Sequence, residues 1–168
     1  EYLDRQVGHA TVEGFTETIL GRRRYIPELQ AANPRVRDLG RRQALNAPIQ
    51  GSASDVFKVA MIEVDRVLRA APELECHMLL TVHDELVFEV PEAAVERAAA
   101  LVQERMEHAV ELEVRLQADV GWGTNWSDAR VSNARMPGSR PTRSASARAI
   151  ARVTCFSNVP PRPLAPGS

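Results

Sequence analysis

The sequence is poor in several residue types, and each scarcity excludes a class of protein. Its two cysteines, Cys76 and Cys155, form no Cys-x-x-Cys pair, so a structural zinc site is not expected, and they indicate either a reducing cytosol or nothing about the compartment. His9, His77 and His108 stand singly, without the spacing of metal ligands, and we interpret each as structural or solvated. No apolar run reaches 18 residues and no signal peptide is visible, so we expect no membrane span or membrane partner.

Acidic and basic residues are also distributed unevenly along the chain. The chain has a single lysine, Lys58, and its last 38 residues contain six arginines but no acidic residue. Residues 1–130 hold 15 basic and 22 acidic residues, a net charge of −7, against −1 for the whole chain. Such an acidic body excludes a protein that binds nucleic acid over its entire surface. Binding must therefore use local basic clusters, which gather in the first third of the chain at Arg22, Arg23, Arg24, Arg35, Arg37, Arg41 and Arg42.

Residues 79–90 (LLTVHDELVFEV) carry the most information about chemistry. Two short apolar runs flank His83, Asp84 and Glu85, a pattern that predicts an antiparallel hairpin with these three residues at its tip. A carboxylate pair at such a tip suits Mg²⁺, which prefers oxygen ligands. Aspartate is also common in ordinary turns, so the triplet by itself favours a solvated turn. The segment upstream changes this interpretation.

Arg42, Asn46 and Gln50 recur every four residues, which places them on one face of a predicted helix. Pro48 lies between them and is expected to kink that helix. All three side chains donate hydrogen bonds, and the minor groove of DNA presents an acceptor at every base pair. Such a row of donors can check duplex geometry without reading sequence.

Three segments follow one another along the chain: Gly21–Pro27 (GRRRYIP), Asn46–Gly51 (NAPIQG) and Val82–Leu86 (VHDEL). A fourth segment, Gly121–Trp126 (GWGTNW), comes after them. In order and spacing these segments resemble the C-terminal fingers and palm part of bacterial family A DNA polymerases, and the resemblance runs from about residue 1 to Arg130.

The resemblance implies a role for each residue of the predicted hairpin tip. Asp84 is implied as a ligand of two catalytic Mg²⁺ ions and Glu85 as an auxiliary catalytic carboxylate beside them. His83 is implied to contact the primer strand near its 3′ end. Arg42, Asn46 and Gln50 match the family's minor-groove and primer-template contacts. The arginines at 22–24 match a basic hairpin turn of the fingers, with a structural or phosphate-facing role.

The resemblance also implies an enzyme, a DNA-directed DNA polymerase. The complete protein is expected to transfer nucleotides from dNTP to a primer 3′-hydroxyl on primer-template DNA, by a two-metal mechanism, in DNA replication and repair. We expect it to be a cytoplasmic monomer. The family's first catalytic aspartate and its nucleotide-binding helix are not found in this sequence. We therefore expect a fragment that does not polymerise alone and that leaves apolar faces exposed.

Two other functions remain open. The first is a catalytically incomplete remnant that still contacts primer-template duplex through His83 and the donors on the predicted helix. The second is a metal-dependent phosphohydrolase that uses Asp84 and Glu85. The phosphohydrolase is the weaker alternative, because two adjacent carboxylates supply too few metal ligands without partners elsewhere. Binding to primed duplex without nucleotide incorporation would favour the remnant.

Periodicity predicts the order helix, hairpin, helix, hairpin, helix, strand, which is an α+β fold with antiparallel strands packed against helices. Residues 55–70 read as a helix with Asp55 on its polar side, and a further helix runs from Pro91 to about Ala109. Strict alternation over residues 114–120 predicts a half-buried strand. The apolar face of the first of these helices is formed by Phe57, Ala60, Met61, Val64, Val67 and Leu68.

We divide the sequence into three parts. Residues 1–34 are the end of the fingers with a basic β-hairpin, and residues 35–130 are the C-terminal palm segment. Residues 131–168 are rich in Pro, Ser and Arg and lack apolar periodicity, so we expect them to be disordered. They suit a basic arm that holds DNA phosphates, but we favour an unrelated extension or translation past a frameshift.

Overall fold

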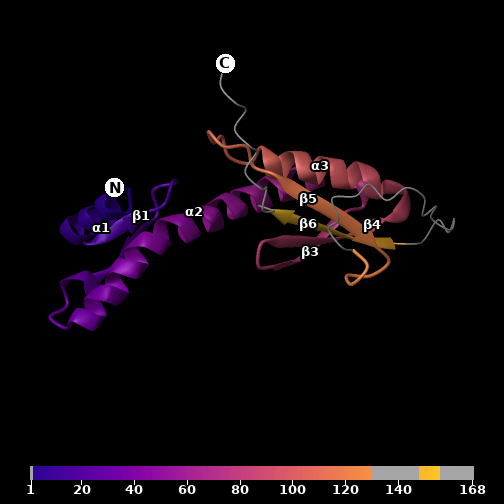
Figure 1. Cartoon of the computed structure of the whole chain (residues 1–168). Helices are drawn as coiled ribbons and strands as arrows, with labels where there is room; N and C mark the ends of the chain where they lie inside the picture. Colours follow the sequence, from indigo (N-terminus) through magenta and orange to yellow (C-terminus); the bar gives the residue numbers. More distant parts are fainter. Residues whose placement is uncertain (1, 130–147, 156–168) are drawn as a thin grey trace, which may run out of the picture. The chain divides into compact units, whose positions relative to one another are not determined.

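The computed structural model describes residues 2–129 and 148–155 (Figure 1). Contacts divide the chain into two compact units, Glu1–Lys58 and Val59–Ser168, and each is described here by itself. The division falls inside a long helix, whereas the sequence suggested a boundary between residues 34 and 35, where that helix begins. The elements in chain order are α1 (Tyr2–Glu13), β1 (Phe15–Glu17), β2 (Arg23–Tyr25), η1 (Pro27–Gln30), α2 (Pro34–Ala70), η2 (Pro72–Leu74), β3 (His77–Val82), β4 (Glu85–Pro91), η3 (Glu92–Ala94), α3 (Val95–Glu107), β5 (Ala118–Gly123) and β6 (Arg148–Cys155).

The first unit joins α1, the β1–β2 hairpin and the start of α2. Gly14 has a φ of +80° and its amide bonds to the Ala10 carbonyl at 2.9 Å, which is how a glycine ends a helix before a strand. The two strands pair antiparallel, with Thr16 opposite Arg24. The apolar core of this unit contains Ala10, Ile26, Leu29 and Ala44. The predicted basic hairpin is thus confirmed.

Helix α2 begins at Pro34, where the Asn33 side chain accepts a hydrogen bond from the Arg35 amide at 2.9 Å. An asparagine cap followed by proline at the first helical position is a favoured start. Pro48 lies inside the helix, which is assigned as one element through to Ala70. The predicted helix over residues 55–70 is confirmed, with Phe57, Ala60, Val64 and Leu68 buried.

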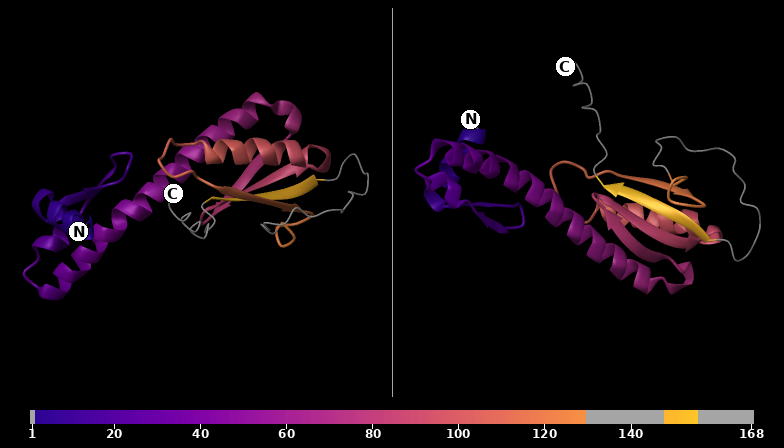
Figure 2. Two further views of the ribbon diagram at one scale, coloured as in Figure 1. Left: turned by 45° about the horizontal axis from the view of Figure 1, so that its top comes forward. Right: turned by 90° about the horizontal axis from the view of Figure 1, so that it is seen from below.

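The second unit is built on a four-stranded sheet with the order β3-β4-β6-β5, in which every neighbouring pair is antiparallel. Helix α3 packs along one face of this sheet (Figure 2). The helix buries an apolar stripe formed by Val95, Ala98, Ala99, Val102 and Met106. Leu86, Phe88 and Val90 alternate along β4 and are buried. Helices and antiparallel sheets together give the α+β fold that the sequence predicted.

The last predicted strand is shifted along the chain. We expected residues 114–120, but β5 spans Ala118–Gly123. Val114 is 77% exposed, so the alternation upstream of Ala118 does not reflect a buried face. Pairing starts at Ala118 because its backbone is held there by α3: Gln103 donates to the Ala118 carbonyl at 2.8 Å, and the Ala118 amide donates to Glu107 at 3.3 Å.

The expectation of disorder after residue 130 is wrong for residues 148–155. They form β6 in the middle of the sheet, paired to β4 on one side and β5 on the other. Ala149, Ala151 and Val153 are buried and alternate with less buried residues. The sequence pattern did not reveal this two-residue period, because its buried residues are small and stand among the arginines and serines of the tail. The rest of that expectation falls on residues 131–147 and 156–168, which lie outside the described residues.

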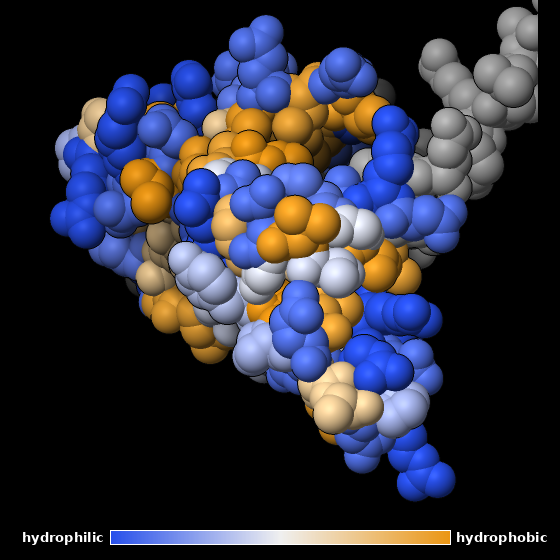
Figure 3. Space-filling view, turned by 90° about the vertical axis from the view of Figure 1, so that its left-hand side faces the viewer, coloured by the Kyte–Doolittle hydropathy of each residue, from blue (hydrophilic) through white to orange (hydrophobic). Residues whose placement is uncertain are grey.

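Large apolar side chains remain exposed on the first unit, as expected of a chain whose faces are incompletely covered. Figure 3 shows such residues lying among hydrophilic ones on one face of the molecule. No helix in the described part of the chain is both long and apolar enough to cross a bilayer. The exposed apolar residues of this unit are Val12, Ile19, Leu20, Tyr25, Leu39 and Ile49.

Candidate nucleic-acid interface and active site

The predicted hairpin forms from β3 and β4, with His83 and Asp84 as its two turn residues. Val82 lies opposite Glu85, which starts β4, so the tip carries the expected triplet. His83 has a φ of +56°, a left-handed conformation that costs a non-glycine residue about 1–3 kcal/mol. Such strain is concentrated at functional sites, and both turn residues are exposed to solvent.

The two carboxylates of the tip differ in environment. Asp84 is exposed and forms no side-chain hydrogen bond or ion pair with another residue of the described ranges. The Glu85 side chain is only 14% exposed and forms an ion pair with Arg152 of β6. Within residues 2–129 and 148–155, no three His, Cys, Asp or Glu side chains cluster as a metal site would require. The donors of the described residues therefore do not by themselves make up a complete Mg²⁺ site.

In the first unit, α2 presents the predicted row of donors. Arg42, Asn46 and Gln50 are exposed, while Ala44 and Pro48 on the other side of the helix are buried. None of the three donors bonds to another side chain or backbone group in the described part of the protein. Their hydrogen-bonding groups are thus free for a ligand.

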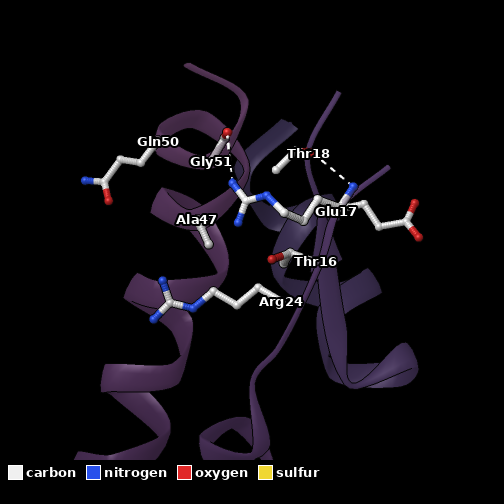
Figure 4. A pocket seen from close by; sticks show the side chains of 8 residues that line it. Thr16, Glu17, Thr18, Arg24, Ala47, Gln50 and Gly51 are labelled. Carbon is white, nitrogen blue, oxygen red and sulfur yellow. Dashed lines mark hydrogen bonds between the residues drawn. The ribbon is translucent and has the colours of Figure 1, made fainter. Parts of the chain in front are cut away.

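Gln50 stands at the rim of a small cavity between α2 and the basic hairpin (Figure 4). The cavity has a volume of about 70 Å³, enough for water or the end of one side chain but not for a nucleotide. Arg24 also lines it and forms no ion pair with the described residues. The cavity is lined by Thr16, Glu17, Thr18, Arg22, Arg24, Ala47, Gln50 and Gly51.

The turn of the basic β1–β2 hairpin is held against α2 by Asp55. We expected this residue on the polar side of the helix. Asp55 is instead buried, with 8% of its surface exposed. Thr18 donates to one of its oxygens at 2.7 Å, and Arg22 Nε donates to the other at 2.8 Å. The hydrogen bond from Thr18, joined by the Arg22 ion pair, lowers the pKa of Asp55 below its ordinary value.

Gly51 explains why the turn of the basic β1–β2 hairpin can lie so close to α2. A Cβ at this position would stand 2.6 Å from Thr18 Cγ2 and 3.3 Å from an Arg22 nitrogen. Arg22 also donates to the Gly51 carbonyl at 3.1 Å (Figure 4). Of the three hairpin arginines, Arg22 is therefore structural, and Arg23 pairs with Glu17 at 2.5 Å. Of the three arginines, Arg24 alone has no ion-pair partner among the described residues.

Comparison with known proteins supplies the deciding observation. A model of DNA polymerase family A matches residues 1–128. The chain belongs to DNA polymerase family A. The match includes all six candidate residues of the hairpin tip and of α2, and it ends before β6.

The relatives that the chain matches include DNA polymerase I from Mycobacterium tuberculosis, 51% identical over 129 residues. That match covers 77% of this chain but 14% of the relative. DNA polymerase I from Geobacillus stearothermophilus is 45% identical over 130 residues, which is 77% of this chain and 15% of the relative. This family A chain therefore spans about one seventh of the length of the mycobacterial relative it matches.

A solved structure of the same family has the same fold. It is described as the POL domain of Pol1 from M. smegmatis in complex with DNA primer-template and dNTP. The match has a TM-score of 0.73 at 50% identity and covers 76% of this chain and 22% of the other. The resemblance that the sequence motifs suggested is thus confirmed at the level of the family and of the fold.

Proposed function

We propose that this chain is the C-terminal fingers and palm part of a DNA-directed DNA polymerase. The observation that carries the proposal is the family match over residues 1–128, which includes both the donor row on α2 and the hairpin tip. The complete protein would add nucleotides from dNTP to a primer 3′-hydroxyl, in replication and repair. Its partners would be primer-template DNA and dNTP, and it would act as a monomer in the bacterial cytoplasm.

Arg42, Asn46 and Gln50 are proposed to contact the minor groove of the primer-template duplex. Three observations support this role: the residues lie on one helix face, they are exposed, and they have no partners in the described structure. Acceptors occur at every base pair of the minor groove, so donors spaced along a helix suit duplex DNA of any sequence. His83 is proposed to contact the primer near its 3′ end.

Asp84 and Glu85 are proposed as the catalytic carboxylates, with Asp84 as a metal ligand. In the complete enzyme, Asp84 would be one of the residues that hold two Mg²⁺ ions, which would supply Lewis-acid chemistry when bound. The exposed, unpaired state of Asp84 among the described residues supports this assignment. The same residues hold no cluster of three metal-ligating side chains, so we propose that the remaining ligands belong to other parts of the complete protein.

A chimera tests the proposed activity. Residues 1–129 of this chain would replace the matching segment of M. tuberculosis DNA polymerase I, to which they are 51% identical. We expect primer extension by the chimera to stay within about tenfold of the parent enzyme, because the proposed contacts are all carried by the exchanged segment. A well-folded chimera that binds primer-template but adds no nucleotide would contradict the polymerase assignment.

The second candidate function, a DNA-binding remnant, is favoured for the isolated chain by the incomplete set of metal donors in the part of it that the structure describes. The 168-residue chain should bind primed duplex in low salt and lose affinity steeply as salt is raised, without incorporating dNTP. Fluorescence anisotropy with a labelled primer-template measures the binding. Absence of binding even at low salt would reject this function for the isolated chain.

A further inference from the structure

Strand β6 does not belong to the family-matched part of the sheet that it completes. The family match ends at residue 128, and β6 spans Arg148–Cys155. Its two neighbours, β4 and β5, both lie within the match. Neighbouring strands are roughly 4.8 Å apart, so without β6 these two would face one another across about 9.6 Å. We call this space between β4 and β5 the strand gap.

The side chains of β6 fit the strand gap on the face that α3 covers. Ala149, Ala151 and Val153 point to this face and are at most 4% exposed. Ala151 lies opposite Phe88, one of the largest buried side chains of the sheet. Small residues beside large ones let the central strand pass under the helix without overpacking.

The other face of β6 matches the strand gap in charge. Arg152 forms an ion pair with Glu85, and Arg148 contacts Glu89 at 2.5 Å. The two acids lie on β4 and the two arginines on β6, so each ion pair joins the two strands. Residues 59–129 contain five basic and fifteen acidic residues, which favours a basic segment as the occupant of this gap.

The backbone pairing is continuous on both sides. Residues 148–154 pair with β4, from Arg148 opposite Pro91 to Thr154 opposite Glu85. Residues 150–155 pair with β5, from Ile150 opposite Gly123 to Cys155 opposite Ala118. In the described sheet, β5 has β6 as its sole neighbour. The place of β5 in the sheet therefore depends on the strand that fills the gap.

We propose that the strand gap is a binding site for an extended peptide, and that residues 148–155 of this chain are its occupant. The ligand it takes is a strand with small apolar residues at alternate positions and arginines between them. Backbone bonds to two strand edges supply affinity, while the buried pockets and Glu85 and Glu89 select the side chains. Since the site is defined by the sheet, it does not rest on the proposed polymerase activity.

Amide hydrogen exchange on the full chain tests this proposal. Replacing Ala151 by proline removes an N–H from the centre of β6, so we expect amides of β5 to exchange about tenfold faster or more. Ala151→Gly, which keeps the N–H, is the matched control and should have the smaller effect. The β3–β4 amides report whether the rest of the sheet is intact. Unchanged exchange in β5 on Ala151→Pro would overturn the proposal.

Adding a synthetic peptide of residues 148–155 to the Ala151→Pro chain should restore slow exchange in β5 in a saturable manner. The same peptide carrying Ala151→Pro should not. Failure of the unaltered peptide to restore protection would show that the gap does not accept a strand from solution and would overturn the binding site.

A charge exchange keeps the test independent of proline. Arg152→Glu places two carboxylates together and should accelerate exchange in β5, while Arg152→Glu combined with Glu85→Arg should return it close to that of the unaltered chain. Equal acceleration in the single and double variants would contradict the ion pair that we assign to this strand.

Discussion

Glu85 at the start of β4 forms an ion pair with Arg152 of β6, so a proposed catalytic carboxylate is neutralised by a residue outside the family match. Both side chains are largely shielded, with 14% and 27% of their surfaces exposed. In the described structure, the Nε atom of Arg152 has no hydrogen-bond partner, so Glu85 is the principal group that balances its charge.

The pair should contribute measurably to stability. We expect Arg152→Ala to lower the free energy of unfolding by about 1–3 kcal/mol, because it leaves the Glu85 carboxylate partly buried without its partner. Glu85→Ala should cost a similar amount, and the double variant less than the sum of the two. Urea unfolding followed by circular dichroism measures all three variants. Strictly additive losses would show that the two side chains do not interact.

Asp55 links the stability of the basic hairpin to pH. Its pKa is lowered in the folded protein, chiefly by the hydrogen bond from Thr18, so folding favours the carboxylate. The stabilisation is complete above the pKa of Asp55 in the unfolded chain, about 4, and is lost as pH falls through the lower pKa of the folded protein. We expect Asp55→Asn to reduce stability at pH 7 and to flatten the loss of stability between about pH 4 and pH 2.

Thermal unfolding across this pH range measures the effect. Asp65→Asn is a suitable control, since Asp65 pairs with Arg69 on the exposed surface of α2 at 2.7 Å. If Asp55→Asn left both stability and its pH dependence unchanged, Asp55 would not be the group that fastens the hairpin.

His83 occupies a backbone conformation that suits glycine. Because its φ is +56°, we expect His83→Gly to raise the free energy of unfolding by about 1 kcal/mol. Asp84→Gly is the matched control, because Asp84 is not among the positive-φ residues, and glycine there should bring no gain. Differential scanning calorimetry compares the two variants. A loss of stability in His83→Gly would mean that the histidine side chain holds the turn.

The order of the three α-helices and the first five strands, and the α+β class, could be predicted because they follow from local rules. The Asn33-Pro34 start of α2 and the apolar face through Phe57 and Val64 each need only nearby residues to be recognised. The turn between β3 and β4 could also be predicted from nearby residues. The left-handed backbone of His83 could not, since we expected no particular conformation there.

Contacts between distant residues could not be predicted in the same way. Asp55 was placed on the polar side of its helix because periodicity cannot reveal that Thr18 and Arg22, more than 30 positions away, would cover it. Strand β6 was missed because Ala149 and Ala151 are small and lie in a segment of disorder-like composition. Its strand form depends on the strand gap, which no local pattern encodes.

Arg42 and Gln50 should contribute differently to DNA binding. We expect Arg42→Ala to reduce the salt dependence of binding to primed duplex by about one unit of slope, whatever its sequence. Gln50→Ala removes donors but no charge, so it should weaken affinity with the slope unchanged. Arg66→Ala, which removes one exposed charge elsewhere on α2, is the matched control for Arg42. Identical effects of Arg42→Ala and Arg66→Ala would contradict a contact at Arg42.

Replacing Asp84 in the chimera with the mycobacterial polymerase should affect nucleotide addition but not DNA binding. Because it is exposed at a turn and unpaired among the described residues, its replacement should leave folding and duplex affinity within about twofold. We expect Asp84→Ala to lower the rate of primer extension by about 10³-fold or more, since a proposed metal ligand is lost. Glu92→Ala, which removes a carboxylate at the opposite end of β4, is the control and should extend primers normally. Primer extension by Asp84→Ala at the parental rate would exclude Asp84 as a catalytic metal ligand.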